Sequence, residues 1–247
     1  LAIVIATALS YFATFVSIKP IFKNIAKDKD SKKHVFDKKE ILNYSWPALI
    51  SAVLLVVAIN IDVILIKHYF SPHDAGIYAA ISTIAKIVLY VTAPIVTVMF
   101  PMISEKTTSG DKHYKIFLFS ILFVIIGGLL VLGLYIIAPA KVISLLYGQQ
   151  YVSFYYLLPE VGMAILLYSL INLLVNYYLV VKDFCFLWFF LAVITAMVAA
   201  ISFYHPSIIV VVRLIILFFA LLFSLTMGYY LFSKKDQLKS FMRGDDF

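Results

Sequence analysis

The segment Asn60–Lys86, NIDVILIKHYFSPHDAGIYAAISTIAK, joins two long apolar runs and places one charged residue inside each of them. Asp62 lies in the first run and Lys86 lies in the second. The residues SPHD at 71–74 between the runs are typical of a helix start, with Ser as N-cap, Pro at the first helical position and an acid at the third. The segment therefore predicts a hairpin of two long helices, and its two charges raise the question of what they face.

The composition assigns the chain to the membrane proteins. Of its 247 residues, 64% are hydrophobic and 13% are charged, and the mean hydropathy is +1.02, whereas soluble domains are about half apolar and about a quarter charged. Continuous apolar runs suit helices and not the alternating strands of a barrel. The net charge of +7 does not indicate nucleic acid, because the positive residues lie between the apolar runs. We therefore expect an all-α, polytopic membrane protein.

Seven apolar runs are long enough to cross a hydrocarbon core about 30 Å thick as helices. We expect these spans at residues 1–18, 41–67, 72–104, 116–138, 161–181, 184–204 and 207–233. The polar connector 19–40, which holds eight lysines, is the best internal boundary. It separates the last helix of a first bundle (1–18) from a six-helix bundle (41–233), which a polar tail (234–247) follows. Because Leu1 begins directly in an apolar run, we expect the rest of the first bundle to be missing.

The basic residues predict how the spans are oriented. Sixteen of the 20 Lys and Arg residues fall on one side of the membrane, in the connector 19–40, the loop 105–115, the turn at Lys182 and the tail. Lys67 and Lys141 lie on the other side. The positive-inside rule makes the first side cytoplasmic. We therefore expect the connector and the C-terminus in the cytoplasm.

Five short motifs carry a family resemblance that extends from Leu42 to Tyr151. They are YSWP at 44–47, NID at 60–62, DAGIY at 74–78, VMFPMIS at 98–104 and LLYGQQY at 145–151. In this order and at this spacing the chain resembles the Wzx-like O-antigen flippases, the polysaccharide-export branch of the multidrug/oligosaccharidyl-lipid/polysaccharide (MOP) superfamily. The spans after Tyr151 match that family only in length and topology.

The resemblance implies a protein of twelve or more helices in two bundles around a central cavity, of which this chain would be the sixth helix and the C-terminal bundle. It implies alternating access that moves undecaprenyl-pyrophosphate-linked oligosaccharide outward across the bacterial cytoplasmic (inner) membrane, as in lipopolysaccharide O-antigen assembly. The implied partners are that lipid-linked oligosaccharide, membrane lipids, the missing N-terminal bundle and glycan polymerase machinery. Nucleic acid is not expected as a partner.

Lys86 and Asp62 are the first candidate site residues, because a charge at mid-membrane costs about 2.5–3.5 kcal/mol on insertion scales and usually faces a cavity or a partner. Lys86 is about 16 Å deep in its span. It is either a cavity cation for the pyrophosphate or acidic sugars of the substrate, or one half of a structural ion pair. Asp62 is the expected counter-charge, either as a static pair or as a switch in which a proton or sodium ion on Asp62 frees Lys86.

Five further polar residues are candidates for the cavity. Arg213 lies about six residues into the last span and either lines the cavity or extends to the outer headgroups. Tyr168, Asn172 and Asn176 share one helix face, and Asn60 lies close to Asp62. For these four the alternatives are hydrogen bonds between helices and contacts to sugar hydroxyls. Most Phe and Tyr residues are expected at the lipid surface and the interfaces.

No catalytic set is recognisable in the sequence, so we expect a transporter and not an enzyme, with no cofactor and no metal. The single cysteine, Cys185, excludes an intrachain disulfide. An ion-coupled multidrug or cation exporter of the same superfamily is the first alternative. It would need an acidic cavity, whereas the spans hold two cations, Lys86 and Arg213, and one acid, Asp62. A membrane-embedded glycan polymerase or ligase is the second, and it would need a large outer loop with paired Arg or acidic residues.

Overall fold

The computed structural model describes Ser10, residues 38–109 and residues 114–233. The chain divides into two units, Leu1–Asn43 and Tyr44–Phe247, and almost all described residues belong to the second. The predicted span 1–18, most of the connector 19–40 and the tail 234–247 lie outside the described residues.

The described residues form helices and contain no strand. The elements are α2 (Lys38–Tyr69), α3 (Pro72–Ala85), α4 (Ile87–Ser109), α5 (Tyr114–Ile137), α6 (Pro139–Tyr147), the 3-10 helix η1 (Gln149–Phe154), α7 (Leu157–Val180), α8 (Phe186–Phe203) and α9 (Ile208–Ser233). Six segments are long and apolar enough to cross a membrane, namely Leu42–Tyr69, Pro72–Thr107, Tyr114–Ile137, Leu157–Val180, Phe186–Phe203 and Ile208–Ser233. The all-α, multi-pass membrane fold expected from the sequence is confirmed. We call the end that carries Tyr69, Pro72 and Ile137 the outer end and the opposite end the inner end, following the orientation expected from the lysines.

The predicted hairpin is present, and its turn is short. Ser71 is the N-cap of α3: its Oγ accepts the N–H of Asp74 at 3.2 Å and donates to Asp74 Oδ2 at 2.9 Å. Pro72 occupies the first helical position, where its missing N–H has no consequence. The residues at 71–74 therefore start the second helix as predicted.

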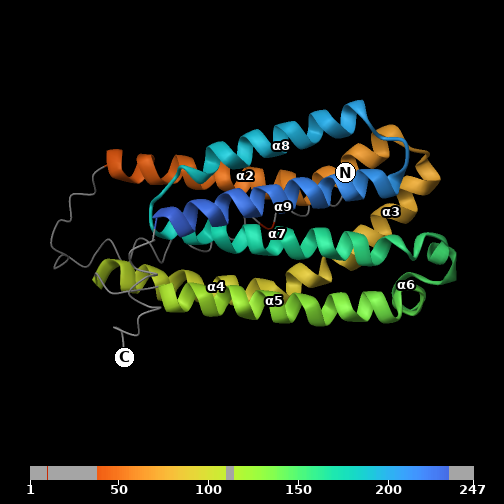
Figure 1. Cartoon of the computed structure of the whole chain (residues 1–247), viewed down its shortest axis with the longest axis horizontal. Helices are drawn as coiled ribbons and strands as arrows, with labels where there is room; N and C mark the ends of the chain where they lie inside the picture. Colours follow the sequence, from red (N-terminus) through yellow and green to blue (C-terminus); the bar gives the residue numbers. More distant parts are fainter. Residues whose placement is uncertain (1–9, 11–37, 110–113, 234–247) are drawn as a thin grey trace. The chain divides into compact units, whose positions relative to one another are not determined.

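The second arm of the hairpin bends at Lys86, where α3 ends and α4 begins. Figure 1 shows α3 running at an angle to α4. The carbonyl of Ile84, which a continuous helix would offer to the N–H of Val88, accepts the hydroxyl of Tyr135 from α5 at 2.7 Å. A side chain that enters the helical hydrogen-bond ladder is a known cause of a kink. The bend therefore lies at Lys86. Pro94, a residue type that often bends helices, lies inside α4 and does not end it.

The outer connector between α5 and α7 is folded into the short helices α6 and η1. Pro139 stands at the start of α6, and Gly148 ends α6 with φ +94°, a backbone conformation that glycine adopts without strain. Tyr147 and Tyr151 pack edge to face across this turn, with ring centroids 5.5 Å apart. Figure 1 shows α6 and η1 at the outer end of the helices.

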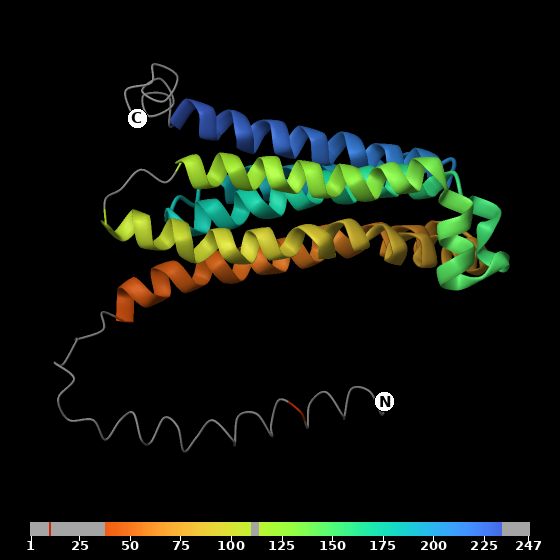
Figure 2. The same cartoon turned by 90° about the horizontal axis from the view of Figure 1, so that it is seen from below.

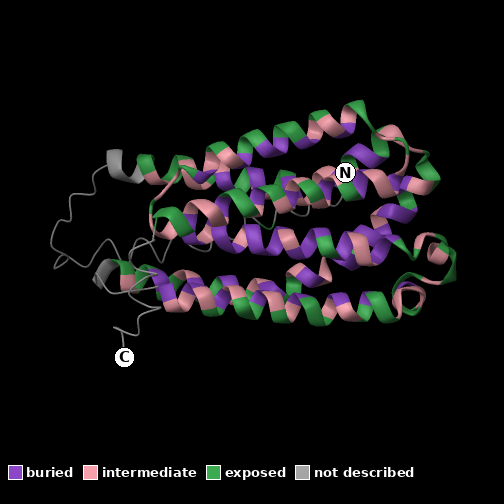
Figure 3. Cartoon of the chain, viewed as in Figure 1, coloured by how far each residue is buried: buried purple, intermediate pink, exposed green. Residues whose placement is uncertain are grey.

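Helix α7 is the centre of the second unit. It packs against α3, α4, α5 and α9, and Figure 2 shows α4, α5 and α9 running in the same general direction. In the most apolar 18-residue window of α7, 72% of the residues are buried, compared with 28–33% in the five other spans. Figure 3 shows the same contrast between the largely buried α7 and the exposed outer faces of α5 and α8. Yet α7 has the lowest hydropathy of the six spans, 1.8, so apolar character alone does not reveal the central helix.

Several tyrosines lie in the core and not at the lipid surface. Of the 16 tyrosines among the described residues, seven are buried, namely Tyr78, Tyr114, Tyr135, Tyr168, Tyr177, Tyr178 and Tyr230. The expectation that Phe and Tyr mostly face lipid or the interface is therefore wrong for these seven. Their hydroxyls need partners once buried, and Tyr178, for example, donates to the Thr226 carbonyl of α9 at 2.7 Å.

The contact between α5 and α7 yields the first prediction. A Cβ on Gly162 of α7 would lie 2.9 Å from the ring of Tyr135 and 3.1 Å from Leu132. The ring is fixed by its hydrogen bond to Ile84, so Gly162→Ala should destabilise the bundle by roughly 1–3 kcal/mol, as overpacking does. Gly133→Ala in α5 is the matched control, because nothing lies within 4 Å of its Cβ. Thermal unfolding in detergent measures both, and equal melting temperatures would contradict the packing described.

Candidate functional site

Asp62 is held inside the bundle by two hydroxyl groups of α3. The Tyr78 hydroxyl and the Ser82 Oγ each donate to Asp62 Oδ2 at 2.9 Å. Tyr78 and Ser82 are one helical turn apart, so their side chains meet the same carboxyl group. The side chain of Asp62 is 6% exposed, and both donors are buried. A carboxyl group in an apolar interior is costly unless it is hydrogen-bonded or protonated, and here only one of its oxygens is satisfied.

The second carboxyl oxygen, Asp62 Oδ1, is buried and accepts no hydrogen bond from the described residues. Asp62 also lines a cavity of about 10 Å³, which is at the lower limit for one water molecule. The polar residues that line this cavity are Asp62 and Tyr78, and the remaining lining residues are Ala58, Ile59, Val161, Ala164, Ile165, Val212, Ile215 and Phe219. The walls contributed by α7 and α9 are therefore apolar and bring no further charge to the carboxyl group.

Lys86 is paired with an amide and not with a carboxylate. Its Nζ donates to Asn60 Oδ1 at 3.0 Å, and the structure forms no ion pair between Lys86 and Asp62. Positions two apart on a helix point in different directions, so Asn60 and Asp62 offer their side chains to different neighbours. Asn60 and Lys86 are half-buried while Asp62 is in the core. The expected static pair is thus replaced by two separate contacts across the same hairpin.

The polar residues of α7 have two different roles. The Tyr168 hydroxyl donates to the Leu55 carbonyl at 3.0 Å and so ties α7 to α2. Asn176 Nδ2 donates to the carbonyl and to Oδ1 of Asn172, at 2.8 and 3.1 Å, within the same helix. Tyr168 therefore forms a hydrogen bond between two helices, whereas the half-buried Asn172 and Asn176 are hydrogen-bonded to each other.

Arg213 forms an ion pair near the outer end that the sequence did not predict. Its Nε and Nη2 donate to the carboxylate of Glu160, with Nη2 2.8 Å from Oε1. The Arg213 side chain is 63% exposed and that of Glu160 is 25% exposed. The pair joins α7 to α9 next to Val161 and Val212, which line the cavity beside Asp62. An exposed pair of this kind contributes orientation more than stability.

The structure adds Tyr78, Ser82 and Glu160 to the residues singled out from the sequence. Tyr78 and Ser82 are spaced four apart on the helix opposite Asp62, a signal that helix-face analysis of the hairpin could have used. Glu160 lies at the start of a span, where the sequence gives no sign of its partner 53 positions away.

A double-mutant cycle tests the carboxyl–hydroxyl contact. Tyr78→Phe removes one donor from a buried acceptor and should cost roughly 1–3 kcal/mol of stability, whereas Tyr90→Phe, on an exposed tyrosine of α4, should cost nothing measurable. In an Asp62→Asn background the effect of Tyr78→Phe should shrink, because contacting residues are coupled. Thermal unfolding of the four proteins in detergent gives the coupling energy, and strict additivity would contradict the contact.

A comparison with known protein families finds a match in the first part of the chain. Residues 1–107 match the family model described as "Polysaccharide biosynthesis protein". No curated protein and no solved structure matches the chain. The matched residues include α2, α3 and most of α4, and therefore Asn60, Asp62 and Lys86. The chain is thus a multi-pass membrane protein whose first 107 residues, candidate hairpin included, are similar to the polysaccharide biosynthesis proteins.

Proposed function

We propose that the protein is part of a flippase that moves undecaprenyl-pyrophosphate-linked oligosaccharide outward across the bacterial inner membrane by alternating access, with its C-terminus in the cytoplasm. It acts as a transporter and not as an enzyme. The similarity of residues 1–107 to polysaccharide biosynthesis proteins and the order of motifs along 42–151 support this proposal, and the charge of Lys86 carries it.

Lys86 offers a positive charge that no carboxylate neutralises directly. Its partner Asn60 accepts a hydrogen bond but carries no charge. Lys86 lies 14 positions after Pro72, about 21 Å along the helix axis from the start of α3, compared with about 16 Å expected from the sequence. A half-buried ammonium group at this depth is stabilised by an anion, and a lysine serves phosphate groups as a point charge. A diphosphate linkage is the anionic part of the proposed substrate.

Asp62 supports a proton as the coupling ion, of the two candidates that the sequence left open. Sodium, a hard cation, needs a shell of several oxygen ligands, and the side-chain oxygens described at Asp62 are its own and those of Tyr78 and Ser82. A proton needs no such shell: it can reside on Oδ1 while Tyr78 and Ser82 continue to donate to Oδ2. The charged state of the carboxyl group would then respond to water entering from the outer end.

The alternative functions have less support. A multidrug exporter needs an acid that an organic cation can reach, and the cavity of about 10 Å³ beside Asp62 cannot admit one. A glycan polymerase or ligase would need charged pairs in its outer loops. The outer segment α6–η1 is occupied by apolar residues, tyrosines and glutamines, with the single cation Lys141.

Loss of the Lys86 charge should stop glycan export. Lys86→Ala in cells that depend on the protein should lower surface glycan by at least about tenfold, which corresponds to the loss of about 1.4 kcal/mol or more of substrate interaction. Lys86→Arg should restore part of the export, and Lys141→Ala, on the exposed face of α6, should leave it unchanged. Surface glycan is quantified alongside protein level in the membrane. Normal glycan in cells with Lys86→Ala would end the proposal.

Removal of the titratable group at Asp62 should uncouple transport from the proton gradient. In vesicles with an imposed pH gradient, Asp62→Asn should reduce the stimulation by the gradient to the level without it, because the amide cannot take up a proton. Asp74→Asn, at the start of α3, serves as the control and should retain the stimulation. An Asp62→Asn protein that still responds fully to the pH gradient would refute the coupling role.

A further inference from the structure

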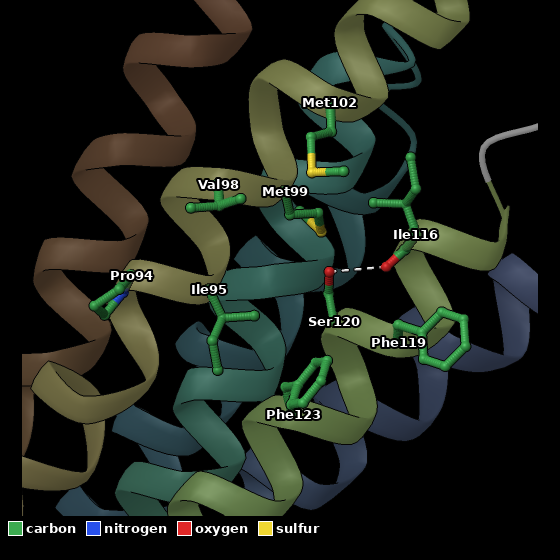
Figure 4. A pocket seen from close by; sticks show the side chains of 9 residues that line it. All are labelled: Pro94, Ile95, Val98, Met99, Met102, Ile116, Phe119, Ser120 and Phe123. Atoms are coloured by element: carbon green, nitrogen blue, oxygen red, sulfur yellow. Dashed lines mark hydrogen bonds between the residues drawn. The ribbon is translucent and has the colours of Figure 1, made fainter.

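An apolar groove runs between α4 and α5 in the inner half of the second unit. Its volume is about 460 Å³, within the range of about 300–1,000 Å³ of small-molecule sites. Figure 4 shows side chains from both helices around it; α4 contributes Pro94, Ile95, Val98, Met99 and Met102, and α5 contributes Ile116, Phe119, Ser120 and Phe123. From Pro94 to Met102 the groove follows α4 for about 12 Å. It is therefore elongated along the helices that form it.

The side chains that line the groove offer neither a charge nor a free hydrogen-bonding group to a sugar or a phosphate. Its one hydroxyl, Ser120 Oγ, donates to the Ile116 carbonyl of its own helix at 2.8 Å (Figure 4). The other side chains are aliphatic, aromatic or methionine, and methionines adapt to ligands of irregular shape. Both helices lie within membrane-spanning segments at this depth, so whatever occupies the groove comes from the hydrocarbon phase. A flexible hydrocarbon chain fits these conditions.

We infer that this groove binds the polyisoprenoid chain of the lipid-linked substrate, an inference that rests on the proposed function. Lys86 and the groove belong to the same span, Pro72–Thr107, and Pro94 follows Lys86 by about 12 Å along the helix. A diphosphate held at Lys86 would therefore have its chain directed along α4 toward the inner leaflet. The polyisoprenoid tail would then stay in hydrocarbon while the diphosphate is held by the protein.

The depth of Lys86 distinguishes this occupant from a membrane phospholipid. Phospholipid phosphates lie at the interface, outside the hydrocarbon core of about 30 Å. Lys86 lies about 21 Å from the outer end of its span and about 32 Å from Thr107 at the inner end. A phospholipid of the inner leaflet could place an acyl chain in the groove, but its phosphate, held at the inner interface, could not also reach Lys86. A lipid that contacts both positions is one whose phosphate has been drawn into the protein.

Photo-crosslinking of the chain in lipid nanodiscs tests the inference. The probe is a long-chain polyprenyl monophosphate with a diazirine in the chain, and labelled peptides are identified by mass spectrometry. The probe should label α4 and α5 peptides around the groove, and excess unlabelled polyprenyl phosphate should displace it. Val98→Trp and, separately, Met102→Trp fill the groove from exposed positions and should each reduce this labelling about tenfold, a loss of about 1.4 kcal/mol. Leu217→Trp, equally exposed on α9, should not.

A second probe and a second readout separate the possible failures. If a diazirine-bearing phosphatidylglycerol labels the groove equally and unlabelled polyprenyl phosphate does not displace it, the groove holds bulk lipid and the inference is overturned. Unchanged labelling in both Trp variants also overturns it. Export by cells carrying Lys86→Ala reports on the proposed function independently: a block of export without groove labelling leaves the flippase proposal standing and removes only the tail site.

Discussion

Hydrocarbon supplies no hydrogen bonds, so polar groups within the bundle depend on partners in the protein, and among the described residues Asp62 Oδ1 and the Tyr230 hydroxyl are buried without one. In this chain tyrosine hydroxyls meet much of that requirement. Tyr78 joins α3 to Asp62 of α2, Tyr135 joins α5 to α3, Tyr168 joins α7 to α2, and Tyr178 joins α7 to α9. Three of the four donate to backbone carbonyls, which possess a second lone pair even when the helix uses the first. These contacts position the helices around α7 and thereby set the places of Asp62 and Lys86.

The sequence predicted those features of the fold that depend on the length of an apolar run. The runs that became α2, α5, α7, α8 and α9 are bounded by lysines, prolines or turns, and the N-cap at Ser71 is a local signal. The bend at Lys86 was not predictable, because the hydroxyl associated with it comes from Tyr135, 51 positions beyond Ile84. The central place of α7 was also not predictable, since lipid and protein interior are both apolar and hydropathy does not distinguish them.

The candidate site was predictable in its members but not in its pairings. Asp62, Lys86 and Asn60 stand out because polar residues are rare in membrane spans. Their partners depend on the rotation of each helix about its axis: two positions separate Asn60 from Asp62, and this suffices to direct one toward Lys86 and the other toward Tyr78 and Ser82. An argument from charge alone paired the acid with the lysine, whereas in the structure two hydroxyl groups donate to one oxygen of the buried carboxyl group and add no charge to the interior.

The bend at Lys86 divides one membrane span into two rods of unequal length, the 14-residue α3 and the 23-residue α4. Their lengths are about 21 Å and about 35 Å. The shorter rod is held at its inner end by Tyr135 and along its side by Asp62, and the longer rod packs against α5 and α7. The ammonium group of Lys86 therefore lies at the joint between the two rods, whereas Met102 lies about 24 Å farther along the longer rod. A single membrane span thus places a charged group at its bend and an apolar groove along its longer rod.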